Sequence, residues 1–188
     1  ELLNPTPNPA QSESVEGTWR VRYSTAPPPS NGQLGPLRGS AIQSLDLTSG
    51  IYANELLVGS DEANPWLSAV LLADWEDRGD GLNWKVNFRT ITLTLFGRFD
   101  LLKMDFGDGT SRIWTTSFID KDMRIVRAGR TKSEAKKKGT SADPKDYFLF
   151  VMTREPVARK ILGDIIVEPK IGLLDVLMDP ARFMDDDD

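Results

Sequence analysis

The run LNWKVNFRTITLTL, from Leu82 to Leu95, decides the fold class, because apolar and polar side chains alternate along it. Such an alternation predicts a β-strand with one dry face. The alternation is broken once, by a step of three residues between Phe88 and Ile91, which predicts either a bulge or a turn. The run GTWRVRYS at Gly17–Ser24 alternates in the same way. Long, half-polar strands that carry large aromatic residues inward are typical of a closed barrel.

Further apolar stretches, separated by short turn-forming segments, extend this pattern along the chain. They are Ala41–Leu47, Ile51–Val58, Trp66–Glu76, Phe99–Phe106, Arg112–Phe118, Met123–Ala128 and Tyr147–Thr153. Gly50 and the segments 77–81 and 107–110 supply residues that favour turns. Eight or nine strands without a crossover helix predict an all-β fold, an antiparallel up-and-down β-barrel.

The 188 residues are enough for one domain with a sizeable core. Residues 1–16 contain three prolines and predict an irregular N-terminal arm. Residues 17–155 form the expected barrel, in which the Pro- and Gly-rich segment 26–40 is a loop or lid. Residues 129–146 carry six basic residues and predict a mobile loop, a flexible basic insertion. Residues 156–188 predict a C-terminal extension with one or two short amphipathic helices and an acidic end.

The composition excludes several classes of function. The chain has no cysteine and no histidine, so thiolate chemistry and the commonest zinc and haem ligands are missing. We therefore expect no metal and no cofactor. Asp46, Asp74 and Tyr52 are available for acid–base chemistry, but no spacing singles out a pair. We expect a noncatalytic protein with no catalytic residue.

The charge of the chain also narrows the choice of partners. A net charge of −5 and a pI near 4.9 disfavour binding to nucleic acid, which depends on a basic surface. The sequence shows neither an apolar run long enough to span a bilayer nor the pattern of a secretory signal.

Several motifs resemble those of the plastid lipid-associated proteins, also called fibrillins. NPTPNP at Asn4–Pro9, GTWRVRYST at Gly17–Thr25 and IQSLDLTSGIYANELLV at Ile42–Val58 are similar to successive family motifs. FIDKDMRIVRAG followed by YFLFVMTRE resembles the C-terminal signature of the family. The chain departs from the family at Phe118, where Tyr is usual, at Ala128, where Gly is usual, and in the long insertion 129–146.

The resemblance implies a lipocalin-like barrel, and Gly17-Thr18-Trp19 also matches the Gly-x-Trp that opens the first lipocalin strand. It further implies a protein of the chloroplast or another plastid, associated with thylakoids or plastoglobules. Such a protein binds or organises hydrophobic small molecules, namely isoprenoids, carotenoids, quinones or fatty acids. We expect the sequence as given not to include a transit peptide.

Four aromatic residues are candidates for ligand binding, because the strand phase turns them inward. They are Trp19, Tyr23, Trp84 and Phe88. An eight-stranded barrel has room either for its own side chains or for one small apolar ligand, so these residues are either core or pocket.

Two charged groups carry further expectations. Asp120, Arg124 and Arg127 belong to the signature strand, and we expect an arginine there to cover Trp19 and pair with Asp120, which closes the barrel. Lys136, Lys137 and Lys138 either contact anionic lipid head groups and a protein partner or form a solvated loop.

Two functions follow from these observations. The first is a lipid-binding protein that holds a hydrophobic molecule or lies on a peripheral membrane or lipid-droplet surface. The alternative is an interaction scaffold with a filled barrel, which docks a membrane or an enzyme of isoprenoid synthesis. Whether the barrel interior is empty distinguishes the two.

Overall fold

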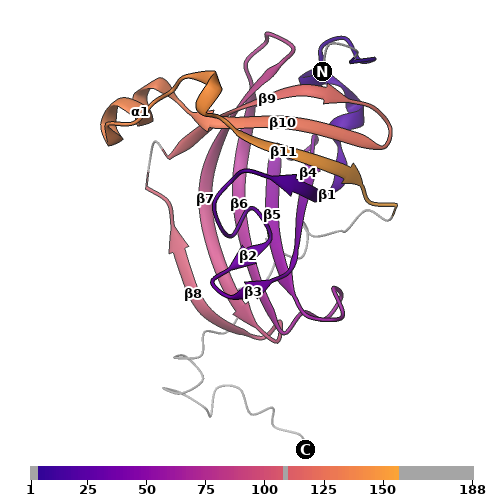
Figure 1. Cartoon of the computed structure of the whole chain (residues 1–188), viewed down its shortest axis with the longest axis vertical. Helices are drawn as coiled ribbons and strands as arrows, with labels where there is room; N and C mark the ends of the chain where they lie inside the picture. The colour runs from indigo at the N-terminus through magenta and orange to yellow at the C-terminus, as the bar shows by residue number, and fades with distance from the viewer. Residues whose placement is uncertain (1–3, 108–109, 157–188) are drawn as a thin grey trace, which may run out of the picture.

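The computed structural model describes residues 4–107 and 110–156, and in that part of the chain the backbone is mostly β-strand (Figure 1). The strands are β1 Gly17–Ser24, β2 Gln33–Leu34, β3 Leu37–Arg38, β4 Ser40–Asp46, β5 Ile51–Val58, β6 Leu67–Asp77, β7 Asn83–Leu95, β8 Phe99–Asp105, β9 Ser111–Ile119, β10 Met123–Arg130 and β11 Phe148–Arg154. The remaining elements are three short 3₁₀ helices, η1 Pro9–Gln11, η2 Glu13–Val15 and η3 Pro144–Asp146, and one α-helix, α1 Lys132–Lys138.

Eight of these strands close into an antiparallel barrel, which confirms the predicted fold class. The order around the barrel is β6-β5-β4-β1-β11-β10-β9-β7, and pairing of β6 with β7 completes the ring. Strand β8 is the ninth strand of the sheet. It pairs with β7 on the edge of β7 that does not face β6. The short pair β2–β3 stands apart as a separate hairpin inside the segment predicted as a loop or lid.

The barrel has a closed half and an open half, because β7 changes partner along its length. Residues 83–87 of β7 pair with β9, whereas residues 90–95 pair with β8. In Figure 1, β9, β10, β11 and β1 cross only the upper part of the molecule, and β5, β6, β7 and β8 continue below them. We call the ringed part the closed half and the continuation the open half.

The step of three residues in the fold-deciding run is a bulge, not a turn. Ala73 of β6 pairs with Phe88 and the next residue back, Leu72, pairs with Thr90, so Arg89 is the extra residue of β7. One extra residue keeps the apolar side chains on the inner face on both sides of the break. At the start of the run, Leu82 precedes the strand and is 44% exposed, so the dry face begins at Trp84.

The main core fills the closed half. Its large buried side chains come from six strands of the ring and include Trp19, Tyr52, Trp84, Val86, Trp114, Ile119, Val126, Phe150 and Met152. A smaller cluster of Leu56, Val58, Leu67 and Ala69 lines the open half, and Leu34 and Leu37 of the β2–β3 hairpin pack against it. The hairpin therefore covers part of the inner face that the ring leaves open.

The N-terminal arm closes the outer end of the closed half. The indole N–H of Trp19 donates to the Val15 carbonyl and that of Trp84 to the Ala10 carbonyl, each at 2.9 Å. Ala10 and Val15 are themselves buried in the core. The arm is thus an end plug that satisfies two buried indole donors.

The basic insertion 129–146, predicted as a mobile loop, carries secondary structure. It contains the end of β10, then α1 and η3. Helix α1 ends in a Schellman motif, since Thr140 N–H donates to the Ala135 carbonyl and Gly139 N–H to the Lys136 carbonyl. The ring of Tyr147 lies so close to Gly129 that a side chain at Gly129 would overlap it. The predicted helical C-terminal extension lies outside the described residues, apart from Pro156.

Candidate functional site

A cavity of about 130 Å³ lies inside the barrel, where the closed half meets the open half. Its wall is largely aromatic, and its lining comes from the β1–β2 loop and from the inner faces of β5, β6, β7, β9, β10 and β11. The lining residues are Ala26, Pro27, Ser30, Tyr52, Asn54, Leu71, Phe88, Arg112, Trp114, Ala128, Phe148 and Phe150.

Strand register explains why these side chains meet. Tyr52 pairs with Ala73, which pairs with Phe88, so the inner faces of β5, β6 and β7 share one row. Trp114 pairs with Ala128, which pairs with Phe148, and this gives the opposite row on β9, β10 and β11. Side chains at directly paired positions point to the same face of a sheet, so both rows point into the barrel.

The aromatic rings contact one another around the cavity. Tyr52 meets Trp114 edge to face with the ring centroids 4.8 Å apart, and Trp114 stacks on Phe150 at 5.9 Å. On the β7 side the guanidinium of Arg112 lies over the ring of Phe88, 5.4 Å from its centroid. These contacts hold the ring-lined wall in fixed orientations.

The apolar lining continues from the cavity onto the inner face of the open half. Leu71, which lines the cavity, pairs with Ile91, and Ile91 pairs with Met104 of β8. Leu93 pairs with Leu102 one step further along. Met104 and Leu102 are 48% and 53% exposed, so the apolar surface between the β2–β3 hairpin and β8 is reached by solvent. We call this surface, formed by Ile91, Leu93, Leu102 and Met104, the apolar trough.

Polar groups at the cavity are few. Asn54 donates from Nδ2 to Ser30 Oγ at 3.3 Å, whereas its buried Oδ1 has no hydrogen-bond partner among the described residues. Arg112 donates from Nη1 to the Ser111 carbonyl at 3.1 Å. Burial raises the pKa of Tyr52 well above 10, so its phenol is neutral. The site therefore offers hydrogen bonds but contains no acid–base pair.

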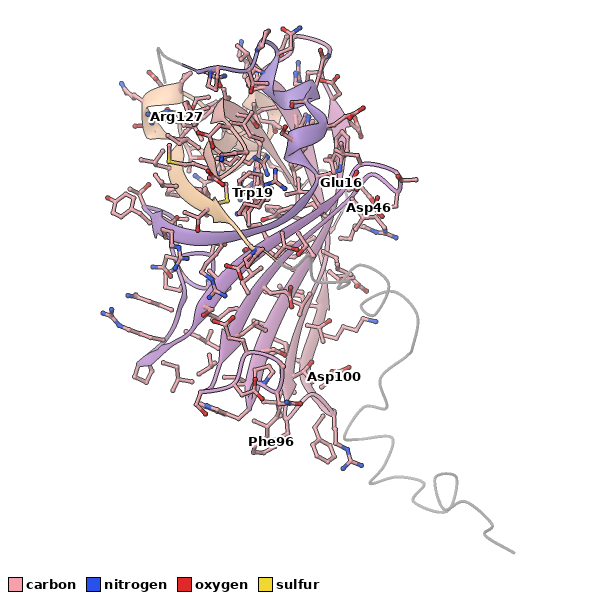
Figure 2. The ribbon with its side chains drawn as sticks, turned by 90° about the vertical axis from the view of Figure 1, so that its right-hand side faces the viewer. Glu16, Trp19, Asp46, Phe96, Asp100 and Arg127 are labelled. Carbon is pink, nitrogen blue, oxygen red and sulfur yellow. The ribbon has the colours of Figure 1, made fainter. Side chains whose placement is uncertain are left out.

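Trp19 and Trp84 face inward as predicted, but neither lines the cavity. Both are buried in the closed half and donate their indole N–H groups to the N-terminal arm. Trp84 also stacks on Trp75, with the ring centroids 4.2 Å apart. Figure 2 shows Trp19 inside the closed half and Phe96 at the opposite tip of the molecule. Both tryptophans belong to the main core cluster of buried side chains.

Tyr23 does not face inward, and the prediction that it does is wrong. A register shift lies between Val21, which pairs with Met152, and Tyr23, which pairs with Val151. Because side chains alternate with a period of two, a bulge of one residue turns the following side chains to the other face. Tyr23 is therefore 57% exposed.

Phe88 alone among the four predicted aromatic residues lines the cavity. The sequence analysis missed Tyr52, Trp114 and Phe150, although each sits at an alternating position of a predicted strand. Asn54 and Arg112 were also missed. A polar residue at an inward position within an apolar alternation was the signal that would have found them.

The arginine that covers Trp19 is Arg154, not Arg124 or Arg127. Its guanidinium lies 4.2 Å from the Trp19 ring centroid and donates to the carbonyls of Lys121 and Glu16, each at 2.8 Å, and to that of Ser14. Asp120 accepts the backbone N–H groups of Asp122 and Met123 and so stabilises the β9–β10 turn.

Arg124 lies inside the barrel instead. It is fully buried, 5.4 Å from the Trp84 ring centroid, and its Nε and Nη1 have no hydrogen-bond partner among the described residues. Burial lowers the pKa of Arg124 to about 9. Arg127 is half-buried, and its neighbours Val126 and Ala128 face the core. Its side chain therefore points to the outer surface.

The three predicted lysines belong to α1, which lies in the chain between the cavity strands β10 and β11. Lys136 and Lys137 are exposed, whereas the side chain of Lys138 lies outside the described part of the structure. Neither Lys136 nor Lys137 lines the cavity.

The candidates for acid–base chemistry do not come together. Tyr52 faces the cavity, whereas Asp46 accepts N–H groups in the β4–β5 turn and Asp74 forms an exposed ion pair with Arg89 at 3.2 Å. A second hollow of about 330 Å³ lies beside Asp74 and Arg89 on the outer side of the β7 bulge. Its lining is mainly charged or polar, so we take the interior cavity as the candidate site.

Comparison with protein-family models and with curated proteins finds no match for this chain. Among the described residues there is no group of three or more acidic side chains placed to hold a metal ion. Within the same residues, no helix has the length and apolar character needed to cross a bilayer.

Proposed function

We propose that this protein is a noncatalytic binding protein for hydrophobic small molecules of the isoprenoid, carotenoid, quinone or fatty-acid kind. The observation that carries the proposal is the cavity with five aromatic lining residues next to the exposed apolar trough, to which it is linked by the pairing of Leu71 with Ile91 and of Ile91 with Met104. A buried end-pocket joined to an exposed apolar surface suits a long apolar molecule, because one end is enclosed and the rest lies along the trough.

The size of the cavity limits how much of a ligand it encloses. A volume of about 130 Å³ is smaller than the 300 Å³ or more of a typical site for a drug-sized ligand. One ring or a few methylenes fit inside, and the rest of the molecule covers the trough. Burial of about ten methylenes at ~0.8 kcal/mol each would supply ~8 kcal/mol before the costs of association, which corresponds to micromolar or weaker binding.

The resemblance to the plastid lipid-associated proteins supports a location in plastids, at thylakoid or plastoglobule surfaces. Lys136 and Lys137 on α1 are exposed and available to anionic head groups there. Each basic residue close to such a surface contributes ~1 kcal/mol to membrane binding. Phe96, 62% exposed at the tip of the open half, lies at the opposite end of the molecule from α1 and so offers a separate contact to a lipid surface (Figures 1 and 2).

The test is retention of lipid from a plastid lipid extract, measured by native mass spectrometry. Leu71→Arg places a charge at the cavity wall, and Leu72→Arg places the same charge on the same strand but on its outer face. We expect the wild type and Leu72→Arg to retain a stoichiometric lipid and Leu71→Arg to lose it. Circular dichroism checks that both variants fold.

Two results would contradict this proposal in different ways. Equal retention in all three proteins would place the lipid outside the cavity. Absence of lipid from all three would favour the alternative function, a scaffold that docks a membrane or an isoprenoid-synthesising partner. The packed closed half, filled by Trp19, Trp84 and their neighbours, is the observation that favours that alternative.

A further inference from the structure

Two side chains that line the cavity have incomplete hydrogen bonding among the described residues. Trp114 has a buried indole N–H without an acceptor, and Asn54 has a buried amide oxygen without a donor. Asn54 is only 6% exposed, and its Nδ2 donates to Ser30 Oγ at 3.3 Å. Its Oδ1 is buried and accepts no hydrogen bond within the described residues. A buried acceptor without a donor is unfavourable and rare in folded proteins, so this atom is suited to a donor brought by a ligand.

The space beside Asn54 fits an aromatic ring. The cavity volume of about 130 Å³ is close to the ~150 Å³ of a cavity that binds benzene in another protein. The rings of Tyr52, Phe88, Trp114, Phe148 and Phe150 line it. Aromatic side chains favour another ring in edge-to-face or offset-stacked contact.

The chemistry of Asn54 Oδ1 selects among polar head groups. A hydroxyl donates a hydrogen bond to this oxygen, whereas an ionised carboxylate only accepts and would leave it without a donor. Arg112, on another wall of the cavity, is a pure donor and can serve the hydroxyl oxygen or a second oxygen on the ring.

We propose that the cavity takes the hydroxylated aromatic ring of a phenol- or quinol-type amphiphile, whose hydroxyl donates to Asn54 Oδ1. The alkyl or prenyl tail then lies along the apolar trough of Ile91, Leu93, Leu102 and Met104. The ligand enters with its polar end first. This inference rests on the proposed function and adds the class of head group and its orientation.

Three probes of equal tail length test the head group. Pentylbenzene has the ring and tail alone, 4-pentylphenol adds a hydroxyl to the ring, and 4-pentylbenzoate adds a carboxylate at the same position. Fluorescence titration follows binding, because Trp114 lines the cavity. We expect 4-pentylphenol to bind about tenfold more tightly than pentylbenzene, as one hydrogen bond allows, and 4-pentylbenzoate to bind no better than pentylbenzene.

Two variants of the full chain assign the preference to one amide. Asn54→Leu replaces the amide with an apolar side chain of similar size. Gln43→Met is the matched control, because Gln43 is a buried, inward amide directly paired with Asn54 that does not line the cavity. We expect Asn54→Leu to bind both neutral probes equally and Gln43→Met to keep the tenfold preference.

Orientation is tested by moving the hydroxyl to the other end of the probe, in 5-phenylpentan-1-ol. We expect it to bind about as weakly as pentylbenzene. If it matches 4-pentylphenol and depends equally on Asn54, the cavity selects a hydroxyl without a ring and the inference is wrong.

Other outcomes separate this inference from the proposed function. Equal binding of pentylbenzene and 4-pentylphenol by the wild type, or tightest binding of 4-pentylbenzoate, would overturn the head-group assignment while hydrophobic binding stands. A preference that persists in Asn54→Leu would overturn it too. Binding of none of the probes, with no lipid retained from the plastid extract, would mean that the proposed function itself fails.

Discussion

Two arginines lie over two tryptophans of the closed half, and their hydrogen bonding differs sharply. Arg154 covers Trp19 from the end of the barrel and donates to three backbone carbonyls, those of Lys121, Glu16 and Ser14. Arg124 lies beside Trp84 in the interior, where Nε and Nη1 have no partner among the described residues. The first contact is favourable, whereas the second buries a charge without an opposite charge among the interactions described.

Replacing Arg154 by alanine should lower the free energy of unfolding by about 2 kcal/mol, because the charged hydrogen bonds and the cation–π contact are lost together. Urea denaturation followed by circular dichroism measures this change. Arg98→Ala is the control, since Arg98 is exposed in the β7–β8 turn and its loss should change stability by less than about 0.5 kcal/mol. Similar losses in both variants would mean that Arg154 does not close the barrel.

Replacing Arg124 by leucine should raise the free energy of unfolding by about 1 kcal/mol or more, because a buried, unpaired charge is removed. The effect should depend on pH with a definite sign. The pKa of Arg124 is lowered to about 9 in the folded state, so the unfolded chain binds more protons above that pH. Above that pH the free energy of unfolding of the wild type therefore rises relative to that of the variant. The difference in stability between the two proteins becomes smaller.

Denaturation of both proteins at neutral pH and at about pH 10.5 measures that gap. A variant that is less stable than the wild type at neutral pH would show that the guanidinium is satisfied inside the barrel.

Bulges control which face each strand presents to the barrel interior. In β7 the extra residue Arg89 keeps both Phe88 and Ile91 inward, and in β1 the shift after Val21 turns Tyr23 outward. The same device preserves the dry face in one strand and ends it in the other. Strand β7 also changes partner from β9 to β8 beside its bulge, so the bulge lies where the closed half ends.

Deleting Arg89 should preserve cooperative folding at some cost in stability. Phe88 and Ile91 then stand two positions apart, so Ile91, Leu93 and Leu95 stay inward, whereas the hydrogen bond from the Phe106 N–H to the Arg89 carbonyl is lost. Arg89→Ala is the control. It removes only an exposed ion pair with Asp74 and should cost less than about 1 kcal/mol. Thermal unfolding followed by circular dichroism distinguishes the two. A deletion variant that no longer melts cooperatively would show that the bulge itself is required for the barrel to close.

Helix α1 shows that local signals for an element can be present in a segment that reads as a loop. Thr131 precedes the helix and Glu134 stands three residues later, which is the spacing of a capping box. Gly139 follows it with φ of +61°, as a Schellman end requires. The high charge of the insertion outweighed these signals in the prediction.

At the scale of the whole molecule, the two halves of the barrel have different tasks. The closed half is a packed core whose outer end is plugged by the N-terminal arm, through the indoles of Trp19 and Trp84. The open half carries the apolar trough and is partly covered by the β2–β3 hairpin. The main core therefore lies at one end of the barrel, and the candidate site faces the other end.

A chain that lacks residues 1–16 should be less stable by about 3 kcal/mol or more, because two buried indole donors lose their acceptors. The tryptophan emission of its folded state should shift to longer wavelength as water reaches Trp19 and Trp84. Gln11→Ala is the control, since it removes only an exposed hydrogen bond to Asp77. Unchanged stability in the truncated chain would mean that the arm is not part of the core.

Binding should respond differently to the same truncation. The arm contributes no residue to the cavity lining, so a truncated chain that still folds should keep its preference for 4-pentylphenol over pentylbenzene. Loss of the preference in a folded, truncated chain would mean that the two halves of the barrel are coupled.

The sequence by itself determined the all-β barrel, the hairpin of β4 and β5 around Gly50, and the break in β7 at Phe88. These features follow from alternation with a period of two and from local turn chemistry, which act over a few residues. It also indicated an aromatic interior, since Trp19, Trp84 and Phe88 all face inward.

Tertiary structure alone decided which inward residues are core and which line the cavity. Trp19 and Phe88 occupy equivalent alternating positions, yet only Phe88 lines the cavity, because the N-terminal arm fills the space around Trp19. The meeting of Asn54, Arg112 and Trp114 likewise depends on how strands distant in sequence are placed around the ring. Alternation in the sequence predicts which face of a strand a side chain lies on. The closure of the ring and the position of the N-terminal arm determine how deep inside the barrel that side chain lies.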